Sequence, residues 1–198
     1  MTKIDVLLAP ENKEFVQLCS KYCDYLERLP DANILQFWET QLQSLSAIYQ
    51  GVLNLPSIEA RYSFEVDKFV TEKAYNKVLK GLSKLIGELD SFPDLSDLSY
   101  PGSAKLQPVN LSELLTDVYQ ELKDFVLLYE TATLENMNDA LCECADTFGQ
   151  YWGVKLLTSL RIIHVNLYQQ RYAANRREQD LEIDIEEVIG DYTGDEEA

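Results

Sequence analysis

Apolar residues recur every three or four positions along most of the chain, which is the spacing of one face of an α-helix. This pattern predicts five helices, at about residues 11–29, 31–50, 71–89, 110–129 and 133–172. Pro10 and Pro30 bound the first helix, and Asn110 with Glu113 forms a capping-box pattern at the start of the fourth. No segment alternates strongly enough for a core strand. We therefore predict an all-α fold, an irregular bundle of about five helices.

Two segments lack this periodicity, and the longest helix is interrupted. Residues 51–70 contain Pro56, and residues 91–109 contain three prolines, so we expect a long connection and a loop. Gly149 and Gly153 fall inside the last helix, where each glycine costs about 1 kcal/mol relative to alanine. We expect either a kink near Gly149 or a close helix crossing at this point.

The charge divides the chain into a domain, residues 1–177, and an acidic tail, residues 178–198. The chain has 34 acidic and 17 basic residues, a net charge of −17, and the tail has ten acids but no Lys or Arg. Such a chain repels phosphate backbones and anionic lipids, so we expect no nucleic-acid and no membrane partner. Without a signal peptide or a long apolar segment, and with four cysteines, it is expected to be cytoplasmic.

Large aliphatic residues are interspersed with the acids of the tail: Leu181, Ile183, Ile185, Val188 and Ile189. The alternation of the first three suits a strand that pairs with the sheet edge of a partner. The last three instead suit one helical turn that docks on this chain or on a partner. A plain solvated tail needs no such residues, so the sequence favours docking.

Catalytic and metal-binding patterns are scarce. His164 is the single histidine, and Arg161 stands where a Glu-x-x-His metal motif needs its glutamate. The chain has no nucleophile turn and no glycine-rich phosphate loop. We expect His164 to be a partly buried structural residue, and we expect no cofactor.

The four cysteines do not form a zinc-binding pattern. Cys19 and Cys23 share one helix face, but Cys142 and Cys144 lie two positions apart and point to nearly opposite sides of a helix. We therefore expect buried thiols and no metal site.

The last predicted helix contains the most distinctive sequence motifs. Its motifs are residues 137–141 (MNDAL), 151–156 (YWGVKL) and 160–164, and upstream stand 69–76 (FVTEKAYN) and 117–125 (DVYQELKDF). Together with residues 14–16 and 22–23, these motifs resemble a bacterial family known only as a domain of unknown function, number five-zero-six-three. The resemblance covers about residues 11–172. It implies an all-helical cytoplasmic protein with no assigned activity, and it assigns no catalytic residues.

One set of polar and aromatic residues on the last helix is a candidate binding pocket: Asn138, Asp139, Trp152, Lys155, Arg161 and His164. Asp117, Glu121 and Asp124 on the fourth helix could form ion pairs with Lys155 and Arg161. Such pairs would set the helix register. In the alternative interpretation, the same groups line a small polar pocket and have displaced pKa values.

Two functions follow from these features. The sequence favours a non-enzymatic protein-interaction module, whose acidic tail or an aromatic patch among its twelve tyrosines and two tryptophans binds another protein. The alternative is a small-molecule-binding or enzymatic bundle that uses the Lys155, Arg161 and carboxylate pocket. A homodimer through the long helix is also open, if its apolar stripe exceeds what the bundle covers.

Overall fold

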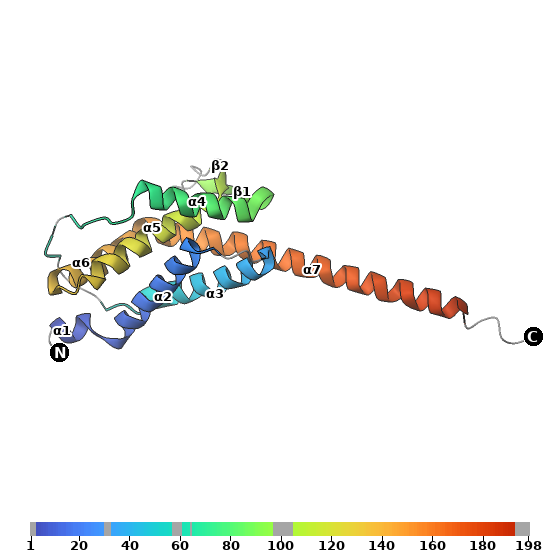
Figure 1. The fold of residues 1–198 in the computed structure, drawn as a ribbon, viewed down its shortest axis with the longest axis horizontal. Helices are drawn as coiled ribbons and strands as arrows, with labels where there is room; N and C mark the ends of the chain where they lie inside the picture. Colours follow the sequence, from blue (N-terminus) through green and yellow to red (C-terminus); the bar gives the residue numbers. More distant parts are fainter. Residues whose placement is uncertain (1–2, 30–32, 57–60, 64, 97–104, 193–198) are drawn as a thin grey trace, which may run out of the picture.

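The computed structural model describes residues 3–29, 33–56, 61–63, 65–96 and 105–192, with the backbone alone for residues 3, 95, 96, 105 and 177–192. Its α-helices are α1 (Lys3–Leu7), α2 (Pro10–Glu27), α3 (Ile34–Leu53), α4 (Glu72–Ile86), α5 (Leu111–Glu130), α6 (Leu134–Thr147) and α7 (Gly153–Tyr192). A 3₁₀ turn, Gly87–Asp90, leads into strand β1 (Ser91–Ser96), and strand β2 is Lys105–Asn110. The predicted all-α bundle with a long C-terminal helix is confirmed (Figure 1).

Helix α5 forms the centre of the bundle. It packs against α2, α4, α6 and α7, while α3 packs against α2 and α7. Its stripe of Leu111, Leu115, Val118 and Leu122 is fully buried. This burial follows from the 3.6-residue period, which gathers these side chains on one face.

Most helix starts are capped as their sequences suggest. Thr71 accepts a hydrogen bond from the Ala74 N–H and begins α4. The predicted capping box at Asn110 is wrong, because the Asn110 side chain makes no capping bond. Instead, Asp90 accepts hydrogen bonds from the N–H and hydroxyl of Ser112, each at 2.7 Å. The second predicted helix was placed from Asp31, which lies outside the described residues, and α3 begins at Ile34.

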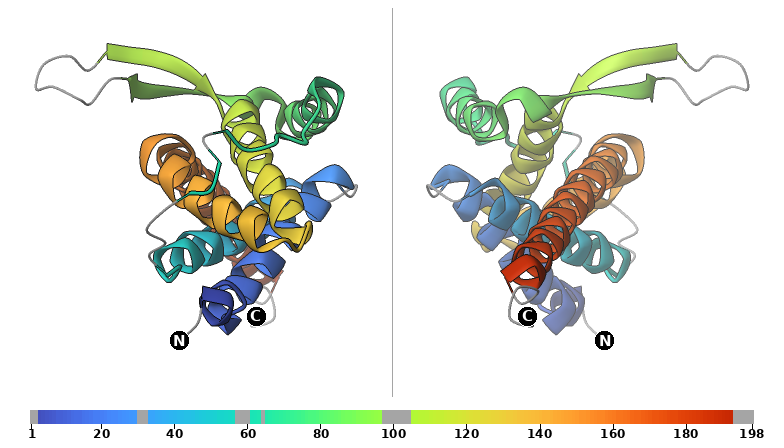
Figure 2. Two further views of the ribbon diagram at one scale, coloured as in Figure 1. Left: turned by 90° about the vertical axis from the view of Figure 1, so that its left-hand side faces the viewer. Right: turned by 90° about the vertical axis from the view of Figure 1, so that its right-hand side faces the viewer.

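The loop predicted for residues 91–109 is partly wrong, since its two ends form a β-hairpin (Figure 2). Strands β1 and β2 are antiparallel, and Phe92 pairs with Val109. The hairpin projects from the bundle, and Leu106 is 71% exposed. A β-ribbon outside the core is held by backbone pairing, so its residues need not alternate between apolar and polar. The sequence pattern therefore does not reveal it.

The predicted helix 133–172 is divided by a π-helical turn, Phe148–Trp152, between α6 and α7. The Gly153 N–H donates to the Phe148 carbonyl, and the buried Trp152 indole donates to the Cys144 carbonyl at 3.2 Å. Gly149 lies within this turn. Gly153 is closely approached by Phe148 of the preceding turn, because the nearest atoms to a Cβ placed at position 153 all belong to Phe148.

Helix α7 is longer than its apolar pattern predicts, because it continues to Tyr192 rather than ending near residue 172. Its C-terminal part projects beyond the bundle (Figure 1). The backbone of residues 178–192 is therefore helical. Of the two docking modes expected for the tail, this backbone matches the helical turn rather than the strand.

Candidate functional site

The structure does not bring the six predicted pocket residues together into one pocket. Asn138 and Asp139 lie on α6, Trp152 lies in the π-turn, and the other three lie on α7. Trp152 is fully buried in the core. The polar members instead face different neighbours.

Asp139 holds a connecting segment, residues 61–63 and 65–70, against the bundle. Its two carboxylate oxygens accept the N–H groups of Tyr62 and Ser63, each at 2.7 Å. Burial opposes ionisation of Asp139, but hydrogen bonds from Tyr62, Asn138 and Ser63 outweigh it, so its pKa lies below the ordinary value. Asp139 is thus a structural clamp.

A second carboxylate clamps the other end of the connecting segment. One oxygen of Asp124 on α5 accepts the N–H groups of Phe69 at 2.6 Å and Val70 at 2.8 Å. Next to the clamped residues, Arg61 and Lys68 form ion pairs with carboxylates of α5 and α6: Arg61–Glu143, Arg61–Asp146, Lys68–Glu121 and Lys68–Glu143. Sequence reasoning missed this arrangement, because backbone N–H groups in a loop have no signature that pairs them with distant acids.

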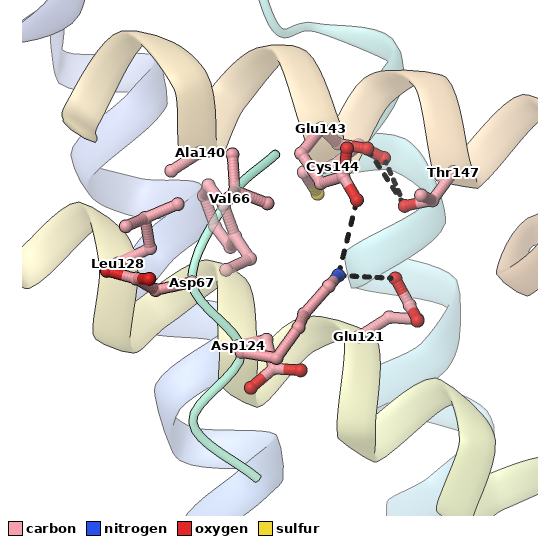
Figure 3. A pocket seen from close by; sticks show the side chains of 11 residues that line it. Val66, Asp67, Glu121, Asp124, Leu128, Ala140, Glu143, Cys144 and Thr147 are labelled. Carbon is pink, nitrogen blue, oxygen red and sulfur yellow. Dashed lines mark hydrogen bonds and ion pairs between the residues drawn. The ribbon is translucent and has the colours of Figure 1, made fainter. Parts of the chain in front are cut away.

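The connecting segment roofs a small recess between α5 and α6 (Figure 3). Lys68 spans its mouth, with its Nζ 3.2 Å from Glu143 and 3.8 Å from Glu121. Burial raises the pKa of Glu121, although Lys68 opposes this shift. The cavity volume is about 10 Å³. That volume is close to the minimum that holds one water molecule, and far below the ~300 Å³ of a typical small-molecule site.

Lys155 and Arg161 tie α7 to two different elements. Lys155 forms an ion pair with Asp117 of α5, as the sequence suggested, and contacts the Tyr151 hydroxyl at 3.0 Å. Burial lowers the pKa of Lys155, but the bonds to Asp117 and Tyr151 raise it by more. Arg161 pairs with Asp94 of β1 and holds the hairpin against α7. Both cations are therefore engaged in structural contacts.

The expectation that His164 is partly buried is wrong. His164 is exposed on α7, and its ring centroid lies 4.5 Å from that of Tyr168. The sequence pattern placed it beside the apolar stripe, but the bundle covers a narrower part of α7 than that stripe.

All four cysteines are buried and keep their thiols. Burial raises the pKa of Cys19, Cys23 and Cys144, which makes these thiols poor nucleophiles. Within the described part of the chain, no group of three or more His, Cys, Asp or Glu residues is placed to hold a metal ion.

The solvent side of α7 carries a row of exposed residues, the outer face: Val154, Leu157, Arg161, Val165, Tyr168 and Tyr172. These residues follow one another at steps of three and four, so they share one side of the helix. The opposite side carries Leu156, Ile163 and Leu167, which are buried. Helix α7 is thus apolar on two sides, and the bundle covers one of them.

The comparisons with known proteins agree with the fold. Protein BF1032 from Bacteroides fragilis, known from a crystal structure, is 30% identical, with a TM-score of 0.70 over 82% of this chain and 99% of that chain. Among curated proteins, none matches this chain. Among the described residues, no helix is both long and apolar enough to cross a membrane. Residues 7–169 match the family described as Domain of unknown function (DUF5063), and the chain belongs to this family.

Proposed function

We propose that this protein is a non-enzymatic protein-interaction module whose binding surface is the outer face of α7. The observation that carries this proposal is the row of apolar side chains on the solvent side of that helix. Val154 is 60% exposed and Tyr172 is 68% exposed, and Leu157, Val165 and Tyr168 lie between them. Contiguous apolar surface of this kind marks interaction sites in proteins.

The energetics of the outer face suit a binding surface. Burying one large apolar side chain contributes about 1.5–3 kcal/mol. Tyrosine adds a polar tip that forms hydrogen bonds at an interface, and tyrosine and arginine are enriched at such surfaces. Tyr168 and Arg171 already stack, with the guanidinium 5.5 Å from the ring centroid.

Two cavities among the described residues favour this function over a small-molecule site. The recess beneath the connecting segment has a volume of about 10 Å³, and Lys68 occupies its mouth. A larger, open hollow of about 480 Å³ is lined by residues of α4 alone: Asn76, Leu79, Lys80, Ser83 and Lys84. A site that selects a ligand needs polar groups that converge from more than one side.

The acidic end of α7 extends this surface. Because its backbone is helical, Ile185, Val188 and Ile189 fall within little more than one turn. We therefore assign docking on a partner, rather than strand addition, to the segment 178–192. The family match ends at residue 169, so this segment lies beyond the shared domain.

The test is affinity capture with mass spectrometry, in which the full chain is compared with a V154S/L157S/V165S variant. We expect the full chain to capture one specific partner, either another protein or a second copy of this chain. We expect the variant not to capture that partner. The control is Leu53→Ser on α3, which is 58% exposed and lies outside the outer face. Circular dichroism verifies that each variant folds.

A second comparison uses a chain that ends at Arg177. Weakened recovery of the same protein would support the assignment of the tail. Equal recovery by the full chain and the V154S/L157S/V165S variant would exclude the outer face as the binding surface.

A further inference from the structure

The charges of α7 are separated into two blocks. Residues 153–177 contain five basic residues and no acid: Lys155, Arg161, Arg171, Arg176 and Arg177. The first three also form ion pairs within the same copy, with Asp117, Asp94 and Glu39 respectively. Residues 178–192 contain seven acids and no Lys or Arg: Glu178, Asp180, Glu182, Asp184, Glu186, Glu187 and Asp191. Both blocks belong to one helix. The charge therefore reverses at a single point, between Arg177 and Glu178.

The rest of the chain restricts what can meet these blocks. Residues 1–152 contain 24 acidic and 12 basic residues, so the remainder of the molecule is strongly acidic. Two copies repel each other in most orientations. The basic block of one copy attracts the acidic block of another, and this contact needs no third component.

We infer that the partner of α7 is a second copy of this chain, bound by antiparallel packing of the two α7 helices. In this arrangement a twofold axis passes near Arg177 and Glu178. Residues 163–177 of each copy, with Arg171, Arg176 and Arg177, then lie along the acidic block of the other copy, and the attraction occurs twice. Parallel packing would instead place like charges together. This inference rests on the proposed function, because it names the partner of the same helix.

The shape of the molecule permits this packing. The acidic part of α7 projects from the bundle, so a partner helix can approach it (Figure 1). Arg176 is exposed at the base of this projection. From Tyr172, helical steps of three and four lead to Asn175, Gln179, Glu182 and Glu186, so the outer face continues into the acidic block. By sequence position, this line along α7 has apolar residues and Arg161 in its first part and glutamates in its second.

The test is a charge exchange measured by sedimentation equilibrium. The R176E/R177E variant makes both sides of the axis acidic, and the E178K/D180K variant makes both sides basic. We expect the full chain to form a dimer and each variant to associate roughly 100-fold more weakly. We expect an equimolar mixture of the two variants to form a heterodimer, because each block again meets its opposite. Far-ultraviolet circular dichroism verifies that the helix persists in each.

The salt dependence and the oligomeric state of the full chain test the inference further. The dimer is expected to weaken by about tenfold or more at high salt, because salt screens the attraction between the two charge blocks. A full chain that remains monomeric at all concentrations would overturn the inference. If the outer face then still captured a different protein, the proposed function would stand and this partner alone would be wrong. If either variant alone formed a dimer as strong as that of the full chain, this result would also overturn the antiparallel arrangement.

Discussion

Gly153 lies directly against Phe148 in the π-turn that joins α6 to α7. A Cβ atom at position 153 would contact the Phe148 carbonyl oxygen and two ring carbons, the latter at 2.8 and 2.9 Å. Rotation of the ring cannot relieve the contact with the backbone oxygen. Glycine at this position therefore permits the π-turn, which aims α7 and orients its outer face.

Substituting Gly153 by alanine should destabilise the protein by about 1–3 kcal/mol, because the π-turn must shift to accept the methyl group. The matched control is Gly149→Ala in the same turn, where a Cβ meets nothing within 4 Å. That variant should be neutral or more stable, by up to about 1 kcal/mol, because alanine favours helices. Urea unfolding measures both. Equal effects at the two positions would contradict this account.

Substituting Gln41 by methionine should increase the stability by about 1 kcal/mol. Gln41 is fully buried, and neither polar atom of its side chain has a hydrogen-bond partner among the described residues. Methionine has a similar shape and removes the cost of burying an unpaired amide. Gln43→Met, at an exposed position of the same helix, should change the stability by less than about 0.5 kcal/mol. A loss of stability in Q41M would show that the amide is paired.

Substituting Asp139 by alanine should destabilise the protein by about 3 kcal/mol, since two N–H groups lose a charged acceptor. Hydrogen exchange at Tyr62 and Ser63 should accelerate in the same variant. The control is Asp146→Ala, which removes only an exposed ion pair with Arg61 and should cost less than about 1 kcal/mol. Unchanged exchange at Tyr62 and Ser63 would disprove the clamp.

The contribution of Asp139 to the free energy of unfolding should depend on pH. The pKa of Asp139 is lowered in the folded state, so its contribution is complete above the ordinary aspartate pKa of about 4. The contribution is lost as the pH falls through the folded pKa. The difference in unfolding free energy between the protein and D139N should therefore shrink below about pH 4. A constant difference across this range would show that ionisation of Asp139 is unimportant.

Glu121→Gln should have the opposite pH dependence. Burial raises the pKa of Glu121, so its ionisation opposes folding as the pH rises through that pKa. The variant should be more stable at pH 7, by about 0.5 kcal/mol, since the lost ion pair with the half-exposed Lys68 contributes little. The gain should vanish at acid pH, where the protein's own Glu121 is protonated. Urea unfolding at both pH values tests this, and a stabilising effect that is larger in acid would refute it.

The helical fold could be predicted from the sequence because it depends on local spacing. The stripes of α2, α3, α4 and α5 recur at the helical period, and each becomes a buried face in the structure. The hairpin could not be predicted, since strands β1 and β2 are joined mainly by backbone pairing outside the core. The candidate pocket was drawn from neighbours along α6 and α7. Lys155, Arg161 and Asp139 contact α5, β1 and the connecting segment respectively, so spacing along one helix did not determine their partners.

The sequence by itself determined the helical periods, the family and the separation of charge along α7, because these properties belong to consecutive residues. Only the tertiary structure decided which side of α7 is buried. Both sides of that helix are apolar, and packing against α3 and α5 covers the side with Leu156 and Ile163. The side with Val154 and Tyr172 is left exposed, because the bundle has no further helix to cover it among the described residues.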